Sequence, residues 1–160
     1  MQKLGVTLGE VPMVWFVLTL FTLMASYFGG LTAGWFGKRW TIILGWSIFA
    51  LVYVGFAYSY TLSICWVLVA VYGVHLGLIE SSERVIAASL VNSHQRASAM
   101  GWYYFAYGIG ALPASLLFGF FWNHVSDKFA FLWNAGLTCV AIVLFLIWLN
   151  PRKGLHDLSA

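Results

Sequence analysis

Two long stretches without formal charge limit the possible folds of this chain more than any other feature. No residue in positions 11–37 carries a formal charge, and none does in positions 40–79. Only Lys38 and Arg39 separate the two stretches. About 20 apolar residues are enough to cross a bilayer as a helix. Because each stretch is longer than that, the sequence predicts an integral membrane protein in which a basic turn joins two spans.

The composition favours the same class of protein. Hydrophobic residues make up 62% of the 160 residues and charged residues only 8%, whereas a soluble domain carries about 25% charged residues. The net charge of +3 comes from cations that lie mostly at the ends of apolar runs, so we expect no nucleic-acid partner. Cys65 and Cys139 lie in separate apolar runs. We expect free thiols there, with no metal site and no cofactor.

Breaks between the apolar runs predict an all-α fold with five transmembrane helices. We expect a single membrane domain over residues 1–160, with spans at about 12–35, 40–58, 62–91, 97–122 and 129–149. Tyrosines near positions 57–63 mark one break, as aromatic residues do at a membrane interface. The second and fifth spans carry few polar residues and are expected to face lipid.

Basic residues in the loops predict the orientation of the spans. Alternate loops place Lys38, Arg39, Arg96, Arg152 and Lys153 on one side and Lys3 and Lys128 on the other. Lysine and arginine are enriched in cytoplasmic loops. The sequence therefore predicts a multi-pass protein of the cytoplasmic membrane, with its C-terminus in the cytoplasm and its N-terminus outside.

The turn between the first two spans, GGLTAGWFGKR, resembles the loop signature G-x-x-x-D-R-x-G-R-R of the major facilitator superfamily. Gly30 and Gly37 match the two glycines of the signature, and Lys38 and Arg39 match its basic pair. Gly34 stands where the family usually has aspartate. Residues 72–91 and 92–122 resemble the closing helices of bacterial permeases in the same superfamily. The resemblance implies that this loop takes part in gating, by meeting acidic residues on the cytoplasmic side.

The resemblance also implies a function. The family is built of two six-helix halves, with the substrate site between them near the middle of the membrane. The five spans match its eighth to twelfth helices, so we interpret the chain as the C-terminal part of a secondary active transporter that moves a small solute by alternating access. Its partners are then the lipid bilayer and the missing N-terminal helices, and Met1 can be an internal methionine. The substrate, the direction of transport and the coupling ion stay open.

Two other classes of function are alternatives to transport. A non-transporting membrane subunit, or a truncated remnant, would use the same spans to pack against another membrane protein. An intramembrane enzyme has less support, because no paired metal ligands and no nucleophile–base pair occur at helical spacing. The sequence therefore assigns no catalytic residue.

The third predicted span carries charged residues close to two glycines. Gly73, Gly77, Glu80 and Arg84 recur on one helical face, and Glu83 lies beside them. An acid four residues before a base favours an ion pair between Glu80 and Arg84. Ionisable residues at membrane depth are usually paired and face the interior of the bundle. We interpret these residues as an intramembrane charge cluster; the alternative is a cluster that snorkels to the headgroups.

Polar side chains on three spans are candidates for a cavity or for the interface between the two halves. They are Thr19, Thr22 and Ser26 on the first span, His75 on the third, and Tyr103, Tyr104 and Tyr107 on the fourth. The structural alternatives are hydroxyls bonded to their own helix, a packing histidine and aromatic packing.

Small residues on the fourth span predict close helix packing. Gly101, Gly108, Ser115 and Gly119 return to one helical face together with Ala97 and Ala111, and such stripes let a neighbouring helix approach closely. Pro113 lacks a backbone donor and is expected to kink this span near its middle.

Overall fold

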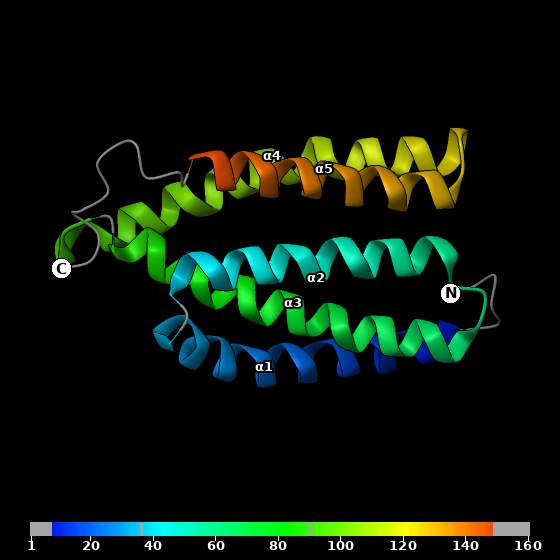
Figure 1. The fold of residues 1–160 in the computed structure, drawn as a ribbon, viewed down its shortest axis with the longest axis horizontal. Coiled ribbons are helices and arrows are strands. Elements are labelled where there is room, and N and C mark those ends of the chain that lie inside the picture. The colour runs from blue at the N-terminus through cyan, green and yellow to red at the C-terminus, as the bar shows by residue number, and fades with distance from the viewer. Residues whose placement is uncertain (1–7, 36, 90, 149–160) are drawn as a thin grey trace.

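The computed structural model describes residues 8–35, 37–89 and 91–148. Five long helices run side by side over these residues (Figure 1): α1 (Val11–Trp35), α2 (Lys38–Tyr58), α3 (Leu62–Ser89), α4 (Arg96–His124) and α5 (Asp127–Trp148). Short 3-10 turns, η2 (Leu8–Glu10) and η3 (Ser93–Gln95), precede α1 and α4. Each of the five helices contains a segment long and apolar enough to cross a membrane. The predicted five-helix membrane fold is therefore confirmed.

Helix α1 ends where the first span is predicted to end and includes three glycines of the sequence GGLTAGWFGKR. Gly29, Gly30 and Gly34 all lie within α1, which continues to Trp35. Glycine inside a helix costs about 1 kcal/mol in water, but an unpaired backbone group in hydrocarbon costs several kcal/mol. The helix therefore continues through the glycines. Gly37 makes the reversal with a φ of 84°, a backbone conformation that a residue without a side chain adopts easily.

The helices are arranged with α2 in the middle. In Figure 1, α1 lies along α3 at one side of the bundle, α2 lies between α3 and α5, and α4 lies beside α5 at the other side. The closest packing joins α1 with α3 and α2 with both α3 and α5, whereas α4 meets α5 and α3 over smaller contacts. One end of the bundle holds the α1–α2 and α3–α4 connections together with the end of α5.

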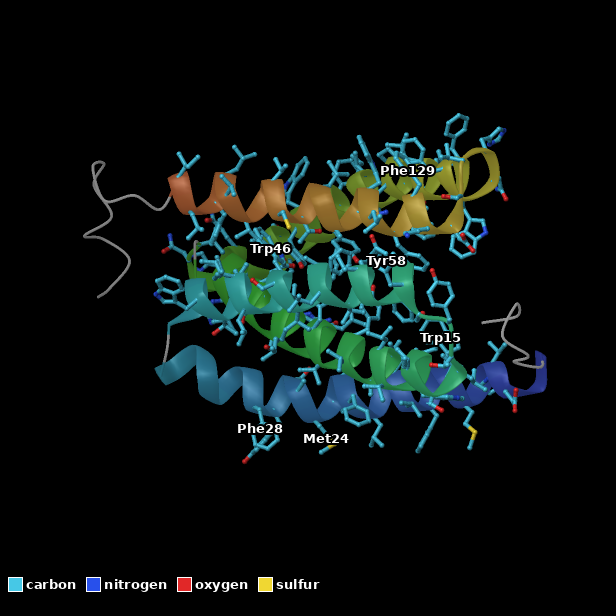
Figure 2. The ribbon with its side chains drawn as sticks, turned by 45° about the vertical axis from the view of Figure 1, so that its right-hand side comes forward. Trp15, Met24, Phe28, Trp46, Tyr58 and Phe129 are labelled. Atoms are coloured by element: carbon cyan, nitrogen blue, oxygen red, sulfur yellow. The ribbon has the colours of Figure 1, made fainter. Side chains whose placement is uncertain are left out.

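The prediction that the second span faces lipid is wrong. Ile42, Val52 and Ala57 of α2 are buried among neighbouring helices. Trp46 of α2 also meets Phe145 of α5, with ring centroids 5.4 Å apart (Figure 2). Lipid tails and helix neighbours are equally apolar, so a uniformly apolar sequence does not distinguish the two environments.

Two glycines of α3 bring its backbone against that of α1. A Cβ atom built at Gly73 would lie 2.6 Å from the carbonyl oxygen of Leu18, and one built at Gly77 would lie 2.7 Å from the Cβ of Ala25. No side chain fits at either glycine unless one helix moves. On the other side of α1, Met24 and Phe28 point away from the bundle (Figure 2) and are exposed. Helix α1 thus has one face packed on α3 and one face open.

Candidate functional site

The predicted charge cluster lies in the last turns of α3. Arg84 donates to Glu80 and forms the i,i+4 ion pair that the sequence predicts. Their side chains are 47% and 48% exposed, whereas Gly73 and Gly77 on the same helical face are buried under α1. The two charged side chains therefore lie on an open part of the chain, available to a neighbouring helix, to a solute or to lipid headgroups.

Glu83 connects this cluster to α4. The hydroxyl of Tyr103 donates to Oε2 of Glu83 at 2.5 Å. Next to it, the guanidinium carbon of Arg84 lies 5.9 Å from the ring centroid of Tyr104, within the range of a cation–π interaction. The charged residues of α3 and the tyrosines of α4 thus meet at one place, which we call the α3–α4 junction: Glu83, Tyr103, Tyr104 and Tyr107. Sequence reasoning assigned these two groups to separate roles because 20 residues separate Tyr103 from Glu83.

The α3–α4 junction lies toward the end of the bundle that also holds the basic turn. Lys38 and Arg39 begin α2 at that end. Their side chains lie outside the described part of the chain. The predicted contact between this loop and the acidic residues of α3 therefore stays a prediction. What the structure does place is the backbone of the loop at the same end as the charges of α3.

The hydroxyl residues of α1 do not form one polar stripe. Thr22 Oγ1 donates to the carbonyl oxygen of Leu18 in its own helix at 2.8 Å. Ser26 Oγ donates across to the carbonyl oxygen of Gly77 in α3 at 3.5 Å. Thr19 is exposed. Two of the three predicted cavity residues therefore take part in the α1–α3 contact instead of lining a space within this chain.

His75 lies inside the bundle, between α2 and α3. It is buried, with Nδ1 2.7 Å from the carbonyl oxygen of Gly45. The rings of Phe49 and Tyr72 lie 5.0 and 5.6 Å from the imidazole, measured between centroids. These contacts fit the packing alternative, and the cavity role of His75 stays a prediction.

The small residues of α4 face open space. No residue of this helix is buried, and nothing lies within 4 Å of a Cβ built at Gly101, Gly108 or Gly119. Ser115 donates only to its own helix, to the carbonyl oxygen of Leu112 at 2.9 Å. Pro113 lies within the helix. We call the set Gly101, Gly108, Ser115 and Gly119 the open face of α4.

An interaction that sequence reasoning missed lies at the opposite end of the bundle. Lys128 Nζ, in the first turn of α5, lies 4.1 Å from the ring centroid of Tyr58 at the end of α2. The turn before it is fixed by Ser126, whose Oγ accepts from the backbone N–H of Phe129 at 3.0 Å as an N-cap. Nothing in the sequence signals the pair, because the two residues belong to helices that the chain does not connect directly.

Five apolar helices with a charged junction toward one end define a multi-pass membrane protein. The family model described as Major Facilitator Superfamily matches residues 1–159. The chain therefore belongs to the major facilitator superfamily. It is also similar to an uncharacterised transporter of this type from Methanocaldococcus jannaschii, with 27% identity over 137 residues. The alignment covers 85% of this chain and 34% of the relative, so the chain spans about a third of that protein's length.

Proposed function

We propose that the chain is the C-terminal part of a secondary active transporter, which moves a small solute across the cytoplasmic membrane by alternating access. Membership of the superfamily supports transport as the activity. The extent of the match supports a partial transporter, because the aligned residues make up only 34% of the archaeal relative. Transporters of this superfamily place their substrate site between two halves, so a second set of helices is required.

The open face of α4 carries this proposal. Inside the chain, two glycines of α3 hold the backbone of α1 at close range. The open face of α4 has the same type of small residue but no neighbour within 4 Å of a Cβ built at its glycines. Helices in membranes associate by close packing at small residues, since lipid supplies no hydrophobic driving force between them. The face therefore fits a helix from the other part of the transporter.

Alternating access then follows from rocking of two bundles around a central site. The end with the basic turn and the α3–α4 junction is the cytoplasmic end by the distribution of loop cations. Half-exposed charges such as Glu80 and Arg84 at that end can exchange partners with the facing bundle as it opens and closes. In this scheme the contacts that hold the cytoplasmic side shut are made between the bundles and are absent in the isolated chain.

Reconstitution in liposomes tests the proposal. The purified chain alone is expected to give no saturable uptake of radiolabelled sugars, amino acids or organic ions. Co-expression with the seven preceding helices, taken from the DNA read in frame upstream of codon 1, is expected to give a co-purifying complex that takes up one of these solutes. Saturable uptake by the chain alone contradicts the proposal, and so does upstream DNA that encodes no such helices.

A matched pair of variants tests the role of the open face of α4. Gly101→Leu is expected to abolish co-purification with the preceding helices, because the larger side chain holds the partner helix away. Gly136→Leu places the same side chain on α5, where nothing lies within 4 Å of a built Cβ either, and is expected to leave co-purification intact. Equal recovery of the complex from both variants would contradict the proposal that the open face of α4 packs against a helix from the other part of the transporter.

A further inference from the structure

Helices α3 and α4 are longer than their neighbours and project past them at one end of the bundle. Helix α3 has 28 residues and α4 has 29, whereas α2 has 21 and α5 has 22. At a rise of 1.5 Å per residue, the excess in each helix is about 10 Å. Short turns join α2 to α3 and α4 to α5 at the opposite end, so the excess appears where α3 connects to α4 (Figure 1). We call residues 92–98, at the end of this projection, the α3–α4 tip.

The α3–α4 tip carries hydrogen-bond donors and no acid. All of its residues are exposed. Its side chains that can donate are those of Asn92, Ser93, His94, Gln95, Arg96 and Ser98. The nearest acids along the chain are Glu83 and Asp127, and Arg96 makes no ion pair within the described part of the chain. An unpaired arginine among neutral donors is a chemistry that suits phosphate.

We propose that the α3–α4 tip binds the phosphate of an anionic phospholipid, with Arg96 as the cation opposite it. The inference adds a lipid partner to the chain and does not depend on which solute the chain helps to move.

The lengths of the helices place the α3–α4 tip in the headgroup layer. The apolar segment of α2 runs from Trp40 to Tyr58 over 19 residues, about 28 Å, which matches the ~30 Å hydrocarbon layer. Both end residues are exposed, as aromatic side chains at the two interfaces are. The headgroups add roughly 5–7 Å on each side. A projection of about 10 Å therefore brings Arg96 to the outer edge of that layer, within reach of lipid phosphates.

A tryptophan on α4 marks the same boundary. Trp102 is exposed and follows Arg96 by six residues, about 9 Å along the helix axis. This places Trp102 near the level of Trp40, where the hydrocarbon layer ends. A cation in the headgroup layer with an aromatic ring at the boundary below it matches the order of a phospholipid, from phosphate to acyl chain.

The charges at this end of the bundle favour an anionic lipid. The described cations at this end are Lys38, Arg39, Arg84 and Arg96, and the described acids are Glu80 and Glu83. At the opposite end, Lys128 stands against Glu10 and Asp127. Each arginine or lysine near a membrane surface attracts anionic lipid, and the attraction decays within a Debye length. A zwitterionic lipid carries its own cation, which competes with Arg96 for the phosphate.

Native mass spectrometry of the purified chain in detergent measures the binding of single lipid molecules. The probes are phosphatidylglycerol and phosphatidylcholine with the same acyl chains. We expect the first phosphatidylglycerol to bind about fivefold more tightly than the first phosphatidylcholine. Equal affinities overturn the proposal, because the chain would then not select lipid by charge.

Variants at Arg96 locate the site. Arg96→Gln is expected to weaken binding of phosphatidylglycerol about three- to fivefold, and Arg96→Lys, which keeps the charge, by no more than about twofold. Lys128→Gln removes a cation at the opposite end, where Lys128 already lies over the ring of Tyr58, and is expected to leave the affinity within about twofold. Unchanged affinity in Arg96→Gln refutes the site, and equal losses in Arg96→Gln and Arg96→Lys contradict recognition by charge.

A wash with inorganic phosphate distinguishes a lipid site from a site for a free anion. Phosphatidylglycerol that stays bound to the purified chain is measured after washing with sodium phosphate or with sodium chloride of equal ionic strength. We expect equal amounts after both washes, because the acyl chains hold the lipid phosphate beside the tip. Selective displacement by phosphate would show a site for free anions and would contradict the assignment to lipid.

Discussion

Replacing Gly77 by alanine is expected to loosen the contact between α1 and α3 more than any other single methyl group added to the chain. The Cβ of the alanine would lie 2.7 Å from both the Cβ of Ala25 and the backbone nitrogen of Ser26, and closer still to the carbonyl oxygen of Thr22. These neighbours are backbone atoms or a Cβ, which no rotamer change can move. Helix α1 as a whole must therefore shift away from α3.

The size of the shift follows from these distances. Ordinary contacts of a Cβ begin at 3.4 Å, so the contacts at 2.7 Å alone require an outward movement of at least about 0.7 Å. A gap of that size forfeits roughly a quarter to a half of the dispersion energy of each contact along the interface. It also lengthens the hydrogen bond from Ser26 Oγ to the carbonyl oxygen of Gly77, which is already 3.5 Å long. Added methyl groups in packed interiors cost about 1–3 kcal/mol, and we expect a loss in the upper part of that range.

Thermal unfolding of the purified chain in detergent measures this loss. A free-energy change of 1 kcal/mol shifts the midpoint by about 2–4 °C in a chain of this size, so Gly77→Ala is expected to lower it by about 5–10 °C. Gly136→Ala adds the same methyl group to α5 in open space and is expected to raise the midpoint by about 2–4 °C, because alanine favours a helix over glycine by about 1 kcal/mol. Equal midpoints for the two variants would refute the close approach of α1 and α3 on which the reasoning depends.

The orientation of the helices is testable with single cysteines in a background that lacks Cys65 and Cys139. Ser59→Cys should react with a membrane-impermeant maleimide from outside the cell. His94→Cys should react only after the membrane is opened, because loop cations favour the cytoplasmic side. Labelling of His94→Cys in intact cells would contradict the predicted orientation. Tyr103→Phe removes the donor to Glu83 and should destabilise the chain by about 1–3 kcal/mol in the same unfolding assay; no change in midpoint would mean that the bond does not hold α4 to α3.

The positions of the five helices could be predicted from the sequence. The break between the second and third spans was placed by tyrosines, and α2 ends at Tyr58 while α3 begins at Leu62. This success has a simple physical basis. A backbone in hydrocarbon must satisfy its own hydrogen bonds, so every apolar stretch of sufficient length becomes a helix whatever its neighbours are. The same requirement explains why α1 continues through its glycines to Trp35, the end predicted for the first span.

The candidate site was predictable only in part. The spacing of Glu80 and Arg84 predicts their ion pair, because residues four apart on a helix are neighbours wherever the helix lies. The partner of Glu83 was not predictable, since Tyr103 lies on another helix and reaches it only through the packing of α3 against α4.

The sequence by itself determined the class of this protein, the number of its helices and most of their ends, because these depend on local apolarity and on backbone hydrogen bonding within each segment. Only the tertiary structure decided which faces are covered. It placed α2 between α3 and α5, buried His75 against Gly45 and left the small residues of α4 open. The physical reason is that lipid and a neighbouring helix are nearly the same solvent for an apolar side chain, so the choice between them depends on shape complementarity between distant segments.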